Sequence, residues 1–298
     1  MTLQERIEGC MWGLMCGDAI GAPVEFKNPD ELEERHPGGV KGIVHCWNDL
    51  RNLQLGQITD DSEMAICLLQ SLVDEGRYDA AAVHRNYVDW MNSEPGDYGN
   101  TIGDALSCNH YDPDSEANGA LMRIAPLAVF AALHPELDWR AAARADAALT
   151  HINPKCADAN VVYVGAVLDA LNGMPGEDIY ARALEAAKGN PALHQLLQDA
   201  VETEPAVYPN IGWLHRAFPT AFYHLLHAKD YPSAILRIVN LIGDPDTNAA
   251  IAGALLGAYM GIGAIPAEWR KTVLACKPAS RPAKYHAAHA ADLLKKLS

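Results

Sequence analysis

The chain has 298 residues, of which 49% are hydrophobic and 20% are charged. This composition provides enough apolar material for a packed core and excludes intrinsic disorder as the dominant state. The formal net charge of −15 and the pI of about 5.1 disfavour non-specific binding to nucleic acid. The same charge would repel an anionic small ligand unless a positive group received it, and a bound metal cation is one candidate.

Helical patterns follow one another along the chain. Residues 2–5 form a capping box of the type Thr-x-x-Glu, and apolar residues then recur at helical spacing as far as Met15. A second helix is predicted to begin at Asp60 or Asp61 and to end at residue 76. Further helices are predicted over residues 79–92, 119–134, 138–150, 157–171, 177–188, 191–201, 213–228, 232–242 and 248–261, followed by an Ala-rich helix at the C-terminus.

The order of these elements points to an all-α fold. Only residues 39–45 have strand character, so the alternation of strands and helices typical of Rossmann and barrel folds is absent. Pro126 and Pro219 lie within two of the predicted helices and are expected to kink or split them. No linker, charge block or fixed repeat divides the chain. We therefore expect one all-α domain over residues 1–298.

The sequence also bears on localisation. The seven cysteines form no Cys-x-x-Cys pair and lie mostly in apolar stretches, as reduced core residues do. Residues 1–8 show no secretory signal, so we expect a cytoplasmic protein. The apolar run over residues 249–265 approaches the length of a membrane span. It contains four glycines and lacks flanking Lys or Arg, so we expect a buried helix and no contact with a membrane.

Two sets of glycines are spaced by four residues and so lie on one face of a helix. They are Gly13, Gly17 and Gly21, and Gly253, Gly257 and Gly261. Chance in a glycine-rich chain is one explanation. The other is close packing of the first helix against the helix over 248–261, which would offset the cost of about 1 kcal/mol for each glycine. Such packing would bring the polar ends of the two helices together.

Two acidic clusters interrupt apolar sequence where predicted helices begin, Thr-Asp-Asp-Ser-Glu at 59–63 and Asp-Pro-Asp-Thr at 244–247. Helix capping is one explanation, although a single acid would suffice for each helix. The alternative is a metal site, because converging carboxylates need a counter-ion. Carboxylate and hydroxyl oxygens without His or Cys suit Mg²⁺ or Mn²⁺ rather than zinc.

Five blocks in chain order resemble the ADP-ribosylglycohydrolase family. They are GDAIGAPVEF at 17–26, GQITDDSEM at 56–64, GNT at 99–101, NGALMR at 118–123 with TH at 150–151, and GDPDT at 243–247 running into GA at 253–254. The resemblance implies an orthogonal all-α bundle with a cleft for ADP-ribose and two divalent cations, Mg²⁺ or Mn²⁺, at its base. It implies release of ADP-ribose from an ADP-ribosylated protein, with arginine as the favoured acceptor.

The resemblance also implies roles for individual residues. The metal ligands would be Thr59, Asp60, Asp61, Asp244, Asp246 and Thr247, the set that the charge argument also selects. The candidates for acid or base catalysis would be Asp60, Asp97 and Glu25. Asp97 could engage the guanidinium of a modified arginine, or it could be an ordinary turn residue after Pro95-Gly96.

The substrate contacts implied by the resemblance are Asn100, Asn118, Gly119, Met122, His151 and Tyr208. Backbone N–H groups at Asn118 and Gly119 could receive phosphate at a helix N-terminus, although a plain cap explains Asn118 equally well. His151 would line the ribose pocket, and Tyr208 lies near the position of an aromatic residue that stacks on adenine.

One departure from the family pattern is Ile242 in place of glycine, which could narrow the approach to the metals. Other functions therefore stay open. The acceptor could be serine, a nucleic-acid end or a free ADP-ribosyl metabolite. The protein could also bind ADP-ribose or a partner without catalysis.

Overall fold

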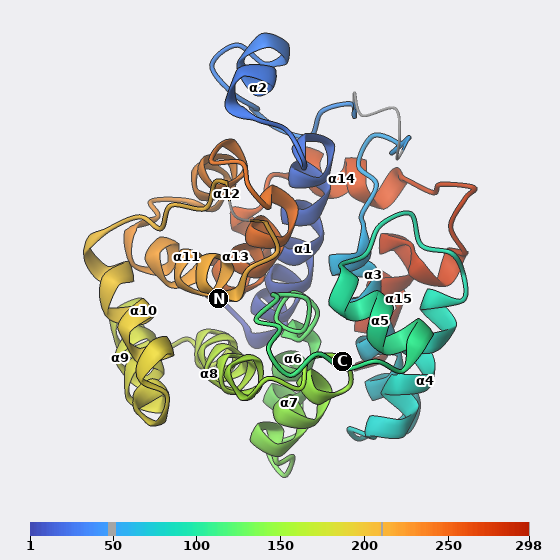
Figure 1. The fold of residues 1–298 in the computed structure, drawn as a ribbon, viewed down its shortest axis with the longest axis vertical. Helices are drawn as coiled ribbons and strands as arrows, with labels where there is room; N and C mark the ends of the chain where they lie inside the picture. Colours follow the sequence, from blue (N-terminus) through green and yellow to red (C-terminus); the bar gives the residue numbers. More distant parts are fainter. Residues whose placement is uncertain (47–51, 210, 298) are drawn as a thin grey trace.

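The computed structural model describes residues 1–46, 52–209 and 211–297. Within these ranges the regular elements are helices and no β-strand forms (Figure 1), which confirms the predicted all-α class. The α-helices are α1 (Leu3–Gly21), α2 (Pro29–Arg35), α3 (Asp60–Glu75), α4 (Ala80–Met91), α5 (Asn100–Cys108), α6 (Ala125–Leu133), α7 (Trp139–Ala148), α8 (Pro154–Leu171), α9 (Gly176–Ala186), α10 (Pro191–Glu202), α11 (Leu214–His227), α12 (Tyr231–Asn240), α13 (Pro245–Met260), α14 (Ala267–Ala275) and α15 (Ala287–Leu297). The 3-10 helices are η1 (Ala22–Val24), η2 (Ala187–Gly189), η3 (Ile262–Ala264) and η4 (Ala283–Tyr285).

Several helix ends lie where the sequence signals place them. Thr2 and Glu5 form the capping box of α1, and Asp79 accepts hydrogen bonds from two backbone N–H groups at the start of α4. The helix α3 begins at Asp60 and ends at Gly76, which has a φ of 61°. The prediction missed α2, α5 and α14, which are short and bury few residues each. No described helix is both long and apolar enough to cross a membrane.

Three local predictions were wrong. Residues 119–124 form turns, and α6 begins only at Ala125. Pro126 therefore lies in the first turn of α6, where a missing N–H leaves no hydrogen bond unmade, so it neither kinks nor splits a helix. Pro219 lies inside α11 and does not split it, whereas a kink at this residue stays a prediction.

The third error concerns residues 39–45, which form no strand. The backbone N–H of Val40 donates to Oδ1 of Asn240 at 2.7 Å, and Nδ2 of Asn240 donates to the Val40 carbonyl at 3.0 Å. The side-chain amide of Asn240, on α12, thus makes the backbone hydrogen bonds that a partner strand would otherwise make with this extended segment.

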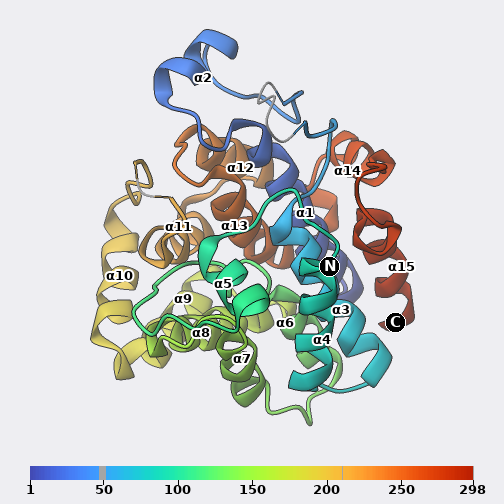
Figure 2. The same cartoon turned by 45° about the vertical axis from the view of Figure 1, so that its right-hand side comes forward.

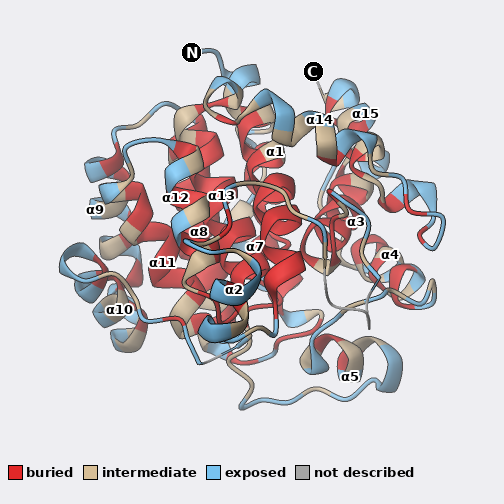
Figure 3. Ribbon diagram, turned by 90° about the horizontal axis from the view of Figure 1, so that it is seen from above, coloured by how far each residue is buried: buried red, intermediate tan, exposed pale blue. Residues whose placement is uncertain are grey.

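The helices α1 and α13 lie side by side through the middle of the molecule (Figures 1 and 2). The helices α8, α11 and α12 pack against α13, and α3 packs against α1. Buried residues concentrate in the central helices, whereas α2 and α5 are mostly exposed or intermediate (Figure 3). The core is continuous from Ile7 to Leu294. The extent of the domain, residues 1–298, stays a prediction.

The glycine spacing has a structural cause, since the backbones of α1 and α13 touch. A Cβ atom at Gly13 would lie 2.1 Å from the carbonyl oxygen of Gly253, and one at Gly257 would lie 2.0 Å from that of Gly9. No real Cβ atom approaches a backbone oxygen so closely. The close-packing prediction is confirmed, with Gly9 as a further member, whereas Gly261 ends α13 with a φ of 76°.

The same contact determines how the two helices meet at their polar ends. Gly21, the last residue of α1, lies against the backbone of Asp246 in the first turn of α13, where a Cβ atom at Gly21 would lie 2.3 Å from the Asp246 Cα. The chain then passes through η1 to Glu25. Close packing therefore places Glu25 beside the acidic start of α13.

Candidate functional site

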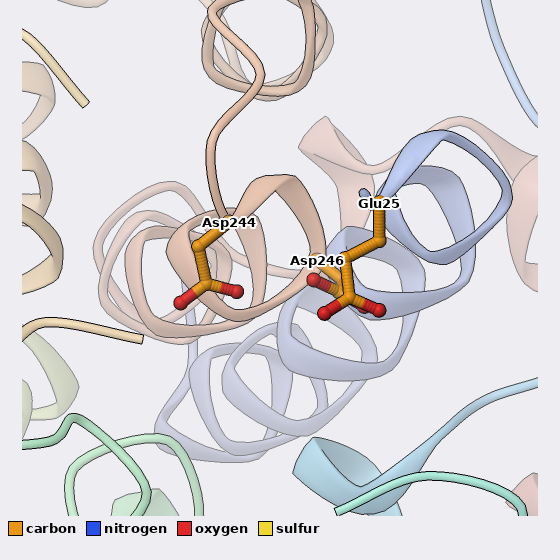
Figure 4. A group of neighbouring side chains, drawn as sticks. All are labelled: Glu25, Asp244 and Asp246. Carbon is orange, nitrogen blue, oxygen red and sulfur yellow. The ribbon is translucent and has the colours of Figure 1, made fainter. Parts of the chain in front are cut away.

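Three buried carboxylates converge where α1 and α13 meet. One carboxylate oxygen from each of Glu25, Asp244 and Asp246 lies within 4.8 Å of the other two (Figure 4). The exposed fractions of these residues are 8%, 4% and 2%. Like charges gathered away from solvent repel one another, so the arrangement favours a bound cation.

Capping of its own helix, α3, does not explain the acidic cluster at residues 59–63. Both the backbone N–H and the hydroxyl of Thr59 donate to the carboxylate of Asp18, at 3.0 and 2.7 Å, and the Ser62 N–H donates to it at 3.2 Å. Asp18 on α1 thus caps α3 from outside. Asp244 also forms no capping hydrogen bond to α13 through its side chain. Capping therefore does not explain the excess of acids.

Burial makes these carboxyl groups reluctant to ionise. It raises the pKa values of Asp60 and Asp61 well above their usual range, and neighbouring carboxylates raise them further. Oδ1 of Asp61 is buried and has no hydrogen-bond partner in the described structure. Burial also raises the pKa of Asp18 to about 6 and raises that of Asp244. An all-oxygen set with an unpartnered carboxylate oxygen fits a hard divalent cation.

Asp244 is held by hydrogen bonds from the segments that precede α6 and α11. Its Oδ2 accepts hydrogen bonds from Nδ2 of Asn118 at 2.6 Å and from the Gly212 N–H at 3.0 Å. No helix begins at Gly119. The helix N-terminus that both sequence hypotheses for Asn118 assumed therefore does not form, so Asn118 is not a helix cap, whereas binding of phosphate at residues 118 and 119 stays a prediction. The Asn118 side chain orients Asp244 instead.

A cavity of about 390 Å³ lies next to these carboxylates. Eleven of the residues predicted from sequence line it, namely Glu25, Asp60, Asp97, Asn100, Asn118, Gly119, Met122, His151, Asp244, Asp246 and Thr247. No individual role was predicted for the residues of the remaining wall, which are Phe26, Tyr98, Gly99, Thr101, Ile102, Ala117, Ile211 and Gly212. None of the described lining residues is Lys or Arg, so the wall supplies no positive side chain to an anionic ligand.

Four sequence expectations fall outside this wall. Thr59 and Asp61 are buried and do not line the cavity, and Tyr208 is 45% exposed and does not line it either. Ile242 lies in the hydrophobic core rather than in the cavity, so it does not narrow the approach. Its φ of 60° is unusual for a β-branched residue.

We expect Mg²⁺ or Mn²⁺ to stabilise the protein more at pH 7 than at pH 4.5. A carboxyl group whose pKa is higher in the folded than in the unfolded state contributes its full stabilisation of the fold below its unfolded-state pKa. This stabilisation is lost as pH rises through its folded-state pKa. For Asp18, with a pKa raised to about 6, this loss is about 3 kcal/mol in metal-free protein as pH rises from well below 4 to well above 6. A cation beside the carboxylates favours their ionised forms and offsets the loss. The measurement is Tm with EDTA, Mg²⁺ and Mn²⁺ at both pH values.

A matched control is Asp292→Asn, which removes an exposed carboxylate on α15. This variant should show the metal response of the unsubstituted protein at both pH values. A metal-induced shift in Tm that is equal at pH 4.5 and pH 7, or absent at both, would contradict the prediction.

Comparison with known proteins places this site in context. The family model for ADP-ribosylglycohydrolase matches residues 1–296. The ADP-ribosyl-[dinitrogen reductase] glycohydrolase of Rhodospirillum rubrum is 32% identical over 276 residues, which cover 90% of either protein. ADP-ribosylarginine hydrolase Tri1 of Pseudomonas putida (strain GB-1) is 26% identical over 287 residues, covering 90% of this chain and 74% of the relative. A solved structure described as an ADP-ribosylglycohydrolase-related protein complex has a TM-score of 0.77 at 27% identity, covering 99% of this chain and 97% of its own.

Proposed function

Since the chain belongs to the ADP-ribosylglycohydrolase family, we propose that it is a metal-dependent hydrolase that releases ADP-ribose from arginine side chains of a modified protein. The family consists of hydrolytic enzymes, and we infer the arginine acceptor and the metal dependence in addition. The supporting observation is the cavity wall, where five carboxylates line a space for a ligand without any Lys or Arg in the described lining. An anionic ADP-ribosyl group can be received there once cations are present.

We assign the metal ligands to the two acidic clusters and to the carboxylate beside them. They are Thr59, Asp60, Asp61, Asp244, Asp246 and Thr247, together with Glu25, whose carboxylate lies near those of Asp244 and Asp246. Two divalent cations, Mg²⁺ or Mn²⁺, when bound here would orient the ribose hydroxyls and lower the pKa of a water molecule for attack at the anomeric carbon.

The side chains of the cavity wall would carry the proton transfers. A departing guanidine group must take up a proton, and a carboxylic acid within hydrogen-bond reach supplies it. Asp60, Asp97 and Glu25 all line the cavity, so each remains a candidate. Burial raises the pKa of Asp60, so in the metal-free protein its carboxyl group keeps its proton to higher pH than an exposed aspartate does.

Arginine as the acceptor fits the charge near Asp97. Between Arg85 and Arg123 the chain has no Lys or Arg, whereas it has acids at 89, 94, 97, 104, 112, 114 and 116. Asp97 is half-buried in the cavity wall and could pair with a guanidinium in the bidentate manner. The name of one relative, ADP-ribosylarginine hydrolase, agrees with this choice.

The proposal is tested by release of free ADP-ribose from a protein that carries arginine-linked ADP-ribose, with Mg²⁺, with Mn²⁺ and with EDTA. A serine-linked substrate is assayed in parallel. We expect release from arginine with either metal and none with EDTA. Release from serine alone would replace the acceptor and keep the site. No release from either substrate, with measurable binding of ADP-ribose, would favour another acceptor or a binding protein.

A further inference from the structure

His151 lies in the cavity wall, and one of its ring nitrogens has no partner. The residue is 1% exposed, and Nε2 forms no hydrogen bond with any described residue. Gly119, also in the wall, faces the same ring edge, since a Cβ atom there would lie 3.1 Å from Cε1 and 3.3 Å from Nε2. A buried polar atom without a protein partner, in the wall of a cavity, indicates a hydrogen bond to a ligand.

The other ring nitrogen determines which nitrogen carries the proton. Nδ1 of His151 lies 2.7 Å from Oγ1 of Thr150, and Nη1 of Arg123 donates to that same oxygen at 2.8 Å. A guanidinium can only donate, so the hydroxyl accepts from Arg123 and retains one proton. The only hydrogen-bond acceptor found beside that hydroxyl among the described residues is Nδ1. Nδ1 therefore accepts, and the ring proton lies on Nε2.

A buried network holds the hydroxyl in this role. Arg123 is fully buried, and its Nε and Nη2 donate to the side chain and the backbone carbonyl of Asp146, at 3.1 and 2.8 Å. Its guanidinium lies 4.4 Å from the ring centroid of Tyr87, whose hydroxyl donates to Asp146 at 2.9 Å. Burial and the Arg123 charge lower the pKa of His151 to about 3, so the imidazole stays neutral.

We propose that Arg123 and Thr150 are positioning residues that hold His151 as the Nε2–H tautomer, so that it donates a hydrogen bond to a hydroxyl or phosphate oxygen of the ADP-ribosyl group. The inference rests on the proposed function for the identity of this ligand. It does not rest on that function for the tautomer, which the protein network sets before any ligand arrives. Neither positioning residue touches the carboxylate cluster.

The tautomer is measured by two-dimensional ¹H–¹⁵N NMR of protein labelled at histidine. The signals of His151 are identified among the 12 histidines by their loss in His151→Ala. We expect Nδ1 to have the shift of an unprotonated nitrogen that accepts a hydrogen bond, and Nε2 to have that of a protonated nitrogen. In Thr150→Val the Nδ1 shift should move toward that of a free acceptor, and Thr150→Ser should restore it.

Binding of ADP-ribose in the presence of Mg²⁺, measured by calorimetry, is the second readout. We expect Kd to rise about tenfold in Thr150→Val and in His151→Ala, and to stay within about twofold in Thr150→Ser. The double variant Thr150→Val/His151→Ala should bind no more weakly than His151→Ala, because Thr150 acts through His151. A purely structural role for Thr150 would give additive losses.

The outcomes separate this inference from the proposed function. An Nδ1–H tautomer, or additive losses in the double variant, would overturn the inference even in an active enzyme. Absence of ADP-ribose binding in the unsubstituted protein would overturn the proposed function and, with it, the ligand named here. The tautomer measurement needs no variant beyond His151→Ala, so it decides the matter even if Thr150→Val does not fold.

Discussion

Replacing Asp61 or Asp246 by alanine is expected to reduce the release of ADP-ribose by at least about 10³-fold, because each change removes a proposed ligand of the cations on which the chemistry depends. The fold should survive. Removing one carboxylate from a buried acidic cluster relieves repulsion between like charges, so the metal-free variants should unfold at the Tm of the unsubstituted protein or above it. Activity is measured on the arginine-linked substrate, and Tm with EDTA and with Mg²⁺.

The two readouts together make this test specific. A variant with a destabilised fold would lose activity and would also have a lower Tm in EDTA. A variant that lacks only a metal ligand would lose activity and the increase in Tm with Mg²⁺, and would keep its Tm in EDTA. Asp292→Ala, at an exposed position on α15, should behave as the unsubstituted protein in both assays. Full activity of Asp61→Ala or Asp246→Ala would remove the metal-site assignment.

Much of the helical layout could be predicted because its signals are local. A cap such as Asp79 bonds to N–H groups two and three residues away, and Gly76 ends α3 in a conformation that glycine adopts freely. The turn over residues 119–124 has no such signal. Its apolar pattern matches that of a buried helix, and the contact that shapes it, between Asn118 and Asp244, spans 126 residues of sequence.

The acidic part of the candidate site was predictable for a different reason. Two clusters held more carboxylates than helix capping uses, so an excess of charge pointed to a cation. No role was predicted for Asp18 because it is a single acid, without a second acidic residue nearby in the sequence to indicate a cluster. Its position within the apolar helix α1 was the one available signal. No role was predicted for Phe26 and Ile211 because they lie outside the regular elements, where periodicity carries no information.

The contact between α1 and α13 gives the second large effect. Gly253→Ala should destabilise the protein by about 4 kcal/mol or more, although alanine is favoured over glycine by about 1 kcal/mol in a helix interior. The added Cβ would lie 2.3 Å from the carbonyl oxygen of Gly13, and backbone cannot rotate aside as a side chain can. The two helices must therefore separate, and they then lose close-packed contacts with each other along their length. The free energy of unfolding is measured in urea.

Gly189→Ala is the matched control, because a Cβ atom at Gly189 meets nothing within 4 Å and its φ is not positive. The same chemical change should therefore leave stability almost unchanged there. Gly21→Ala tests the link to the site, since its Cβ would strike the backbone of Asp246. It should weaken Mg²⁺ binding as well as stability, whereas Gly253→Ala lies further along α13 from the carboxylates. A free energy of unfolding for Gly253→Ala equal to that of the unsubstituted protein would contradict the close contact between α1 and α13.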